Sequence, residues 1–414
     1  MSASPPPYVP GVGERLAYAD RQRGTKASEL RIWWREVDRV LLGLIFALML
    51  IGTAAVAAAS PATARRLSTG DVTLPELYFW FAHIRWQIIG VAVMIGASFL
   101  SRDNARRLGI VLAGSMVVAL MLVPLIGYEV NGAKRWIRFG LGFQPSAFLK
   151  PGFAIAMAWI LSWRLKDPDL PVLAIVSGLM ALIALLLMMQ PNLGATILFT
   201  GVWFVLVMLS GVSMKKIAGI VIGGITGVLA AYFFYGNARN RIDSFLAGGT
   251  AFDQVDLAQK TLLGGGWTGT GFWLGMKKMS LPEAHTDYVF SVIGEEFGLL
   301  VCALVVILYL AIIARVLVRL ADEENLFALL ASAGLATQIG GQAFINILVN
   351  LQLFPSKGMT LPLVSYGGSS TIAVCLAVGL LLALTRRNPF LTRETPGLRS
   401  LLGERGPTDK EKGA

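Results

Sequence analysis

Long apolar runs separated by short polar segments fill most of the chain between residues 38 and 387. Each is close to the ~20 residues that cross a bilayer as a helix. The runs begin near Val40, Trp86, Leu108, Ala147, Pro171, Ala195, Ile217, Tyr288, Asn325 and Ser365. In lipid every backbone polar group must be satisfied internally, so such runs predict helices. We therefore expect an all-α polytopic membrane protein with about ten transmembrane helices.

The pattern divides the chain into three parts. Residues 1–37 and 388–414 are polar and rich in Pro, Gly and charge, which predicts disordered tails. Residues 38–387 form the ten-helix domain. Within it, residues 236–287 make a long polar connection between the seventh and eighth spans. Loops of this length in compact proteins are usually functional, although a plain linker is the alternative.

Composition supports the membrane assignment. Hydrophobic residues make up 55% of the chain and charged residues 15%, against roughly 25% charged in an average soluble domain. This excludes an ordinary soluble enzyme and an intrinsically disordered chain. Two cysteines among 414 residues exclude a disulfide scaffold.

The charge distribution predicts the orientation. Most of the 36 Lys and Arg residues fall on the side of the two termini when ten spans are counted. The positive-inside rule then places both termini in the cytoplasm and residues 236–287 outside the plasma membrane. The net charge of +11 is explained by this topology, so no nucleic-acid partner is expected.

Polar residues concentrate at the end of the long connection, in Leu281–Asp287 (LPEAHTD). Pro282 stops a preceding helix, and Thr286 or Asp287 could cap the following one. The functional alternative makes Asp287 a carboxylate at the membrane boundary beside His285. Partial desolvation there would raise its pKa and suit it to general-base chemistry.

Cationic residues mark a second candidate region. Residues 132–138 place Lys134, Arg135 and Arg138 around Trp136. Such a cluster serves as an interfacial anchor or recognises phosphate, for which arginine is well suited. Lys150 follows at the start of the fourth span, where an ammonium needs a partner.

Irregular backbone is predicted between the last two spans. Residues 354–370 contain two prolines and a glycine pair, and such backbone at membrane depth lines a cavity or packs in protein. A substrate cavity is one interpretation, and close helix packing of small residues is the other. In the eighth span, Glu295 and Glu296 need neutralisation, and charge complementarity suggests Lys150 as the partner of one of them.

These motifs resemble the shape, elongation, division and sporulation (SEDS) family of bacterial cell-wall polymerases. The resemblance extends over about residues 38–389. It rests on Pro282–Asp287 with Gly294–Glu296, on Lys357–Ser370, and on Gly132–Ser146. Lys357-Gly358-Met359-Thr360 and Gly294-Glu295-Glu296 are similar to the division type, and the elongation type is the alternative.

The resemblance implies an inverting peptidoglycan glycosyltransferase that polymerises lipid II at the outer face of the plasma membrane during septal wall synthesis. It places the essential carboxylate on Asp287. The implied partners are lipid II, a class B penicillin-binding protein transpeptidase, other divisome proteins and membrane lipid. A divalent cation, Mg²⁺ or Mn²⁺, is the one cofactor considered, without a dedicated metal site. No nucleotide is expected, because Gly264–Gly271 lacks the Lys-Ser/Thr of a phosphate loop.

The candidate site residues fall into two groups. Candidates for substrate binding are Arg135, Arg138, Lys150, His285, Lys357, Ser365, Tyr366, Ser369 and Ser370. Candidates for supporting positions are Glu283, Glu295, Glu296, Trp136 and Gln144.

The sequence also departs from the family pattern. Ala147 stands where the family usually has Glu, and Asn192 where it usually has Asp. The first change removes the carboxylate expected to neutralise Lys150. Two other functions remain open at this point. A lipid II flippase would also need polar groups and broken helices, and a non-catalytic scaffold for the transpeptidase would not need Asp287.

Overall fold

The computed structural model describes residues 30–68, 73–130, 133–139, 141–165, 167, 169–236, 239–240, 243, 254–355 and 358–386. The chain forms two compact units, one of Met1–Arg39 with Arg386–Ala414 and one of Val40–Thr385. In the first unit, residues 30–36 are helical. The disordered tail predicted for residues 1–37 is therefore wrong at this end. Residues 1–29 and 388–414 of the two predicted tails lie outside the described residues.

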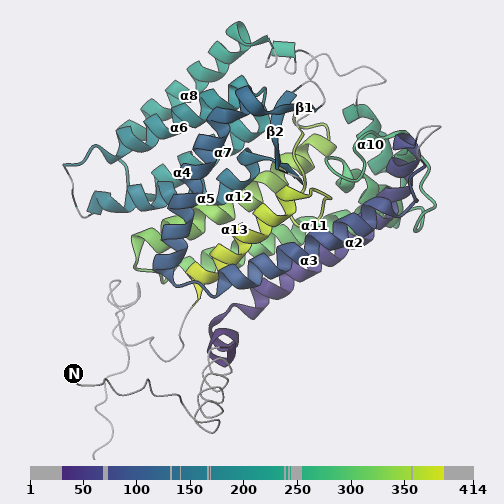
Figure 1. Cartoon of the computed structure of the whole chain (residues 1–414), viewed down its shortest axis with the longest axis horizontal. Helices are drawn as coiled ribbons and strands as arrows, with labels where there is room; N and C mark the ends of the chain where they lie inside the picture. Colours follow the sequence, from purple (N-terminus) through teal and green to yellow (C-terminus); the bar gives the residue numbers. More distant parts are fainter. Residues whose placement is uncertain are drawn as a thin grey trace, which may run out of the picture. The chain divides into compact units, whose positions relative to one another are not determined.

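Apolar helices occupy all ten predicted spans (Figure 1). Among the described residues, eight are long and apolar enough to cross a membrane. They are α2 (Arg39–Leu67), α3 (Tyr78–Ser98), α4 (Arg102–Ile126), α5 (Pro145–Ser162) with η1 (Trp163–Leu165), α6 (Val172–Met189), α8 (Met214–Phe234), α11 (Val289–Leu320) and α12 (Leu326–Asn350). Two shorter apolar helices, α7 (Leu193–Leu209) and α13 (Ser369–Thr385), complete the set.

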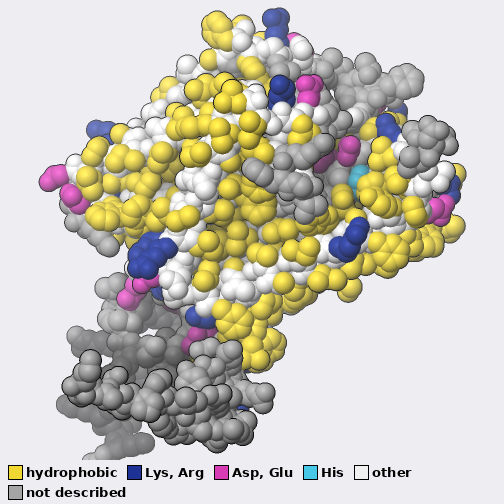
Figure 2. All heavy atoms as spheres, viewed as in Figure 1, with side chains coloured by type: hydrophobic (Ala, Val, Ile, Leu, Met, Phe, Trp, Pro, Cys, Tyr) yellow, Lys and Arg dark blue, Asp and Glu magenta, His cyan; other side chains and the backbone are white. Residues whose placement is uncertain are grey.

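Burial separates the interior helices from those that face lipid. Nearly every residue of α13 is buried, and α12 and α5 are mostly buried. Helix α13 packs mainly on α3, and α12 packs on α5, α7 and α11. Helix α8 exposes its apolar side chains. Figure 2 shows hydrophobic side chains across most of the visible helical surface, as expected of a bundle whose solvent is lipid.

One feature departs from the all-α expectation. The connection between α4 and α5 forms a small antiparallel sheet in the order β1 (Tyr128–Val130), β2 (Ala133–Phe139), β3 (Leu141–Phe143). Tyr128 pairs with Trp136, and Ile137 with Phe143. The β-branched and aromatic residues of this segment favour strands. The chain reverses direction too tightly here to form a helix. Short strands contain no long apolar run, so the hydrophobic pattern does not predict them.

The connection before α11 is built partly from short helices, α10 (Gln254–Gly264) and η2 (Lys277–Ser280). Between them, the loop inserts beside α11 where that helix is broken at Gly298, whose φ is 84°. Thr270 and Gly271 N–H donate to the carbonyls of Glu295 and Glu296. In return Leu299 and Leu300 N–H donate to the carbonyls of Gly266 and Trp267. The loop thus satisfies the backbone groups that the break in α11 exposes.

We expect Gly298→Ala to destabilise the protein. A β-carbon there would lie 2.3 Å from the Trp267 carbonyl oxygen, and the positive φ alone costs a non-glycine residue roughly 1–3 kcal/mol. The matched control is Gly178→Ala in α6, where a β-carbon meets nothing within 4 Å and helix propensity improves by about 1 kcal/mol. Thermal unfolding in detergent measures both. Equal unfolding temperatures for the two variants would contradict the close packing described at Gly298.

Candidate active site

The segment Leu281–Tyr288 forms a compact turn that leads into α11. Glu283 adopts a positive φ of 52°, and its carbonyl accepts from the N–H groups of Thr286 and Tyr288. Helix α11 begins at Val289 with Tyr288 at its N-cap position and no side-chain cap. Neither Thr286 nor Asp287 occupies the cap position, so capping does not explain Asp287.

The backbone of Asp287 is held from α12. The side-chain amide of Asn346 donates to the Asp287 carbonyl at 2.8 Å and to the Met359 carbonyl at 2.7 Å. The amide of Asn350 donates to the same Asp287 carbonyl at 3.3 Å. One buried side chain therefore fixes the Asp287 turn against the irregular segment before α13.

The Asp287 carboxyl is half-buried. Gly358 lies so close that a β-carbon on it would be 3.3 Å from Asp287 Oδ2. Desolvation by the surrounding protein raises the pKa of this carboxyl to about 7. The negative charge of Glu283 raises the pKa further, and the guanidinium of Arg135 opposes the shift. A carboxyl in this environment exchanges protons near neutral pH, as a general base requires.

A ladder of amides on α12 supports this turn and was missed by the sequence reasoning. Gln338, Gln342, Asn346 and Asn350 repeat every four residues, and all four are buried. This spacing places them on one face of the helix. A search for amides at i, i+4 spacing in an otherwise apolar run would have found the ladder.

Lys150 joins the ladder instead of the predicted carboxylates. Its Nζ donates to Gln342 Oε1 at 2.6 Å, and Gln342 Nε2 donates to the Thr360 carbonyl at 2.8 Å. The predicted pairing of Lys150 with Glu295 or Glu296 is therefore wrong. A neutral amide takes the place of the carboxylate that Ala147 does not provide.

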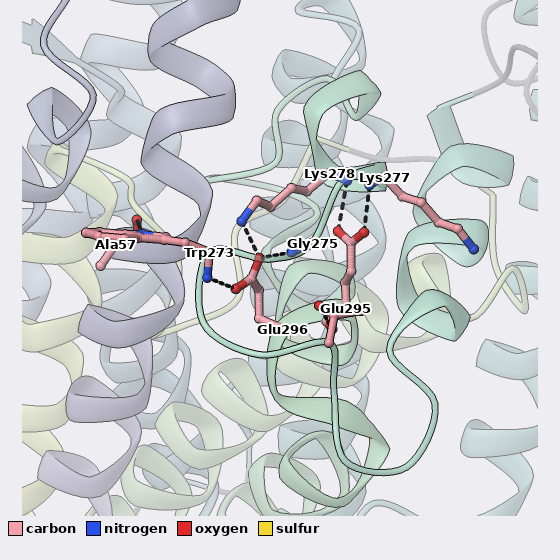
Figure 3. A network of polar contacts seen from close by, with 8 residues as sticks. Ala57, Trp273, Gly275, Lys277, Lys278, Glu295 and Glu296 are labelled. Atoms are coloured by element: carbon pink, nitrogen blue, oxygen red, sulfur yellow. Dashed lines mark hydrogen bonds and ion pairs between the residues drawn. The ribbon is translucent and has the colours of Figure 1, made fainter.

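Glu295 and Glu296 instead bind the inserted loop (Figure 3). Glu295 accepts from the N–H groups of Lys277 at 2.6 Å and Lys278 at 2.9 Å. Glu296 accepts from the backbone of Trp273 and Gly275 and pairs with the ammonium of Lys278. Removing one partner of such a buried ion pair costs roughly 3–5 kcal/mol. Both glutamates therefore hold the loop that leads to Asp287.

His285 is buried on the α2 and α3 side of the turn. Its Nδ1 lies 3.1 Å from Thr63 Oγ1, and its ring contacts Phe79 and Tyr366 at 4.5 and 5.2 Å between centroids. Burial lowers the pKa of His285 to about 4, so the imidazole is neutral at pH 7. The structure places it as packing behind the turn. Tyr366 N–H donates to the His285 carbonyl at 3.0 Å, which ties the two motifs together.

The serines near Tyr366 differ in their bonding. Ser365 Oγ accepts from Leu361 N–H at 2.8 Å, and Ser370 Oγ donates to the Gly367 carbonyl at 2.8 Å. Both stabilise the irregular backbone. Ser369 is buried, and its Oγ has no hydrogen-bond partner among the described residues.

Arg135, one of the cations predicted to bind substrate, has defined contacts in the structure. It lies in β2 and donates to the carbonyls of Gln190 at 3.0 Å and Pro191 at 2.5 Å, in the turn between α6 and α7. Its charge acts on Asp287. The side chain of Arg138 and the whole of Lys357 lie outside the described residues.

Three further residues predicted to support the site are Trp136, Gln144 and Glu283. Trp136 is half-buried in β2 opposite Tyr128. Gln144 precedes α5 without a side-chain cap. Glu283 is exposed, and its Oε2 accepts from Thr286 Oγ1 at 2.8 Å. No group of three or more His, Cys, Asp or Glu suited to a metal ion occurs among the described residues.

Comparison with known families identifies the chain. Residues 38–389 match the family model described as cell cycle protein, which covers FtsW, RodA and SpoVE. The chain belongs to this family. It is 33% identical over 367 residues to the probable peptidoglycan glycosyltransferase FtsW of Caulobacter vibrioides, covering 88% of this chain and 93% of that protein. The FtsW of Hahella chejuensis is 34% identical over 362 residues, covering 84% and 90%.

Solved structures of the family share the fold. A chain of a peptidoglycan synthase complex that coordinates polymerization and crosslinking superposes with a TM-score of 0.67 at 28% identity, covering 84% of this chain and 97% of that one. RodA of Thermus thermophilus gives a TM-score of 0.63 at 27% identity, covering 85% and 97%. The predicted helical membrane fold of the SEDS family is thereby confirmed.

The Lys150–Gln342 contact can be tested by substitution. We expect Gln342→Leu to lower stability, because a buried polar group left without its partner costs roughly 1–3 kcal/mol and a charged one more. Gln342→Glu should lose less stability than Gln342→Leu, because a carboxylate still accepts from the Lys150 ammonium although it cannot donate to the Thr360 carbonyl. Thermal unfolding of both variants in detergent is the measurement. Comparable losses in the two variants would show that the hydrogen bond from Lys150 is not what Gln342 contributes.

Proposed function

We propose that this protein polymerises lipid II into glycan strands, as a division-type peptidoglycan glycosyltransferase of its family. The supporting observation is the environment of Asp287: a half-buried carboxyl with a pKa raised to about 7, close to the positive charge of Arg135. The FtsW relatives named as probable peptidoglycan glycosyltransferases carry the same assignment at about a third identity.

In the proposed reaction Asp287 acts as the general base. Its carboxylate removes the proton from the 4-hydroxyl of the acceptor sugar, and that oxygen attacks the anomeric carbon of the donor. The bond from this carbon to the pyrophosphate oxygen breaks, and its electron pair leaves with undecaprenyl pyrophosphate. Attack opposite the leaving group inverts the anomeric centre. A positioned base contributes roughly 10²–10⁴-fold to the rate.

The leaving pyrophosphate needs positive charge, which arginine and lysine supply well. Among the described cations, Arg135 is the one whose charge acts on the Asp287 carboxyl. We propose that Arg135, Arg138 and Lys357 stabilise the leaving pyrophosphate. Lys150 acts through Gln342 on the Thr360 segment. Mg²⁺ or Mn²⁺, if bound, would be held mainly by the pyrophosphate oxygens and would add positive charge there.

We further propose that the protein works with a class B penicillin-binding protein transpeptidase and other divisome proteins. The structural likeness to a chain of a peptidoglycan synthase complex supports a cross-linking partner. We place both termini in the cytoplasm and the Asp287 turn at the outer face of the plasma membrane, at the division septum. The excess of Lys and Arg on the side of the termini supports this orientation.

Asp287→Asn should abolish polymerisation, because the amide cannot accept the proton, while the fold is retained. The folded state holds the Asp287 proton more tightly than the unfolded state, so this group lowers stability as pH rises from its ordinary pKa to about 7. The variant should therefore unfold at a higher temperature than wild type at pH 8. Lipid II polymerisation and thermal unfolding of the purified protein, alone and with its transpeptidase, are the measurements.

The matched control is Asp322→Asn, an exposed residue just beyond the other end of α11, which should leave polymerisation unchanged. Full polymerisation by Asp287→Asn would refute Asp287 as the general base. If wild type makes no glycan but moves labelled lipid II across vesicle bilayers, a flippase replaces the polymerase.

The pH profile should report the same carboxyl. The polymerisation rate should rise with pH through about 7, because only the deprotonated form accepts the proton. Glu283→Gln removes the negative charge that raises the Asp287 pKa, so the midpoint should move to lower pH with the maximal rate retained. Single-turnover rates from pH 5 to 9 give both midpoints. An unchanged midpoint in Glu283→Gln would assign the titration to another group.

A further inference from the structure

The loop between α10 and η2 carries an unusual surface. Residues 263–276 (LGGGWTGTGFWLGM) contain no charged residue, while Lys260 precedes and Lys277 follows them. Six large apolar side chains in this stretch are exposed: Leu263, Trp267, Phe272, Trp273, Leu274 and Met276. Trp267 is 71% exposed and Met276 75%. An exposed apolar patch of this kind marks a contact with lipid or protein.

The hydrogen bonds to α11 indicate how deep residues 263–276 lie relative to the bilayer. Its residues bond to the backbone of α11 between Glu295 and Leu300. The uncharged stretch of α11, Phe297–Ala314, measures roughly 27 Å as a helix, close to the ~30 Å of bilayer hydrocarbon. The loop therefore lies at the edge of the hydrocarbon layer, on the side of Asp287.

The patch continues the lipid-facing surface of α11. Leu300, Leu304, Ile307 and Leu310 are exposed along one stripe of this helix. The Leu300 N–H donates to the Trp267 carbonyl at 3.2 Å, so the loop backbone adjoins the first residue of the stripe. Its inner side is closed, because Trp273 Nε1 donates to the Ala57 carbonyl of α2 at 3.1 Å.

We propose that residues 263–276 insert into the bilayer interface as a lipid anchor. Tryptophan favours this depth, where its amphipathic ring meets both acyl chains and head groups, and phenylalanine and leucine are buried at the acyl boundary. Lys260 and Lys277, both exposed, suit the head-group region. Non-helical backbone is tolerated there because the groups at the contact with α11 are hydrogen-bonded. The anchor holds η2 and the following Asp287 turn at a fixed height above the hydrocarbon.

Collision measurements on spin labels test the insertion. Leu274→Cys and Met276→Cys are labelled in the full-length protein and reconstituted in vesicles of phosphatidylethanolamine and phosphatidylglycerol. Both native cysteines are buried, Cys302 at 4% and Cys375 at 0% exposure, so the new thiol reacts. Ile307→Cys in the lipid stripe and Glu324→Cys between α11 and α12 are the lipid and water references.

We expect both loop labels to collide preferentially with oxygen, as Ile307→Cys does, and to lose access to a water-soluble nickel chelate. Nickel access equal to that of Glu324→Cys would place the loop in water and overturn the proposal. Protection from both reagents would show that protein covers the patch and would also overturn it. Both tested side chains are exposed, so their substitution removes little packing. This outcome is independent of polymerase activity.

Discussion

The need to satisfy backbone hydrogen bonds away from water governs this structure. Most of the chain meets it with regular helices. Where α11 is broken at Gly298, a loop from the preceding connection supplies the missing partners, and two glutamates bind that loop in turn. The loop therefore stabilises the break in α11, and the glutamates beside the break hold the loop in place. The Asp287 turn lies between the glutamates and the loop in sequence, so its position follows from this mutual support.

Buried amides extend the same principle to the candidate site. Asn346 satisfies the carbonyls of Asp287 and Met359, and one turn away Gln342 connects Lys150 with Thr360. Neutral amides both donate and accept, so they can bridge irregular segments without adding charge. This explains how the fold keeps Lys150 although Ala147 replaces the family's usual carboxylate.

The ten apolar spans and the family could be predicted from sequence, because hydrophobic length indicates the spans and local motifs indicate the family. Contacts between distant residues could not. Charge alone predicts that Lys150 pairs with Glu295 or Glu296, whereas the structure pairs Lys278 with Glu296 and Lys150 with Gln342. The strands at residues 128–143 were missed because short reversals give no long periodic signal. The amide ladder was present in the sequence as i, i+4 spacing.

The contacts of α2 have a consequence for biosynthesis. Helix α2 is synthesised before α3 to α13, yet its Ala57 carbonyl binds Trp273 and its Thr63 lies against His285. Tyr366, close to the last span, also contacts His285. The surroundings of Asp287 therefore close only after α13 has entered the membrane. A chain that still lacks α13 lacks the assembled site, so chemistry at Asp287 cannot start before that helix has been made.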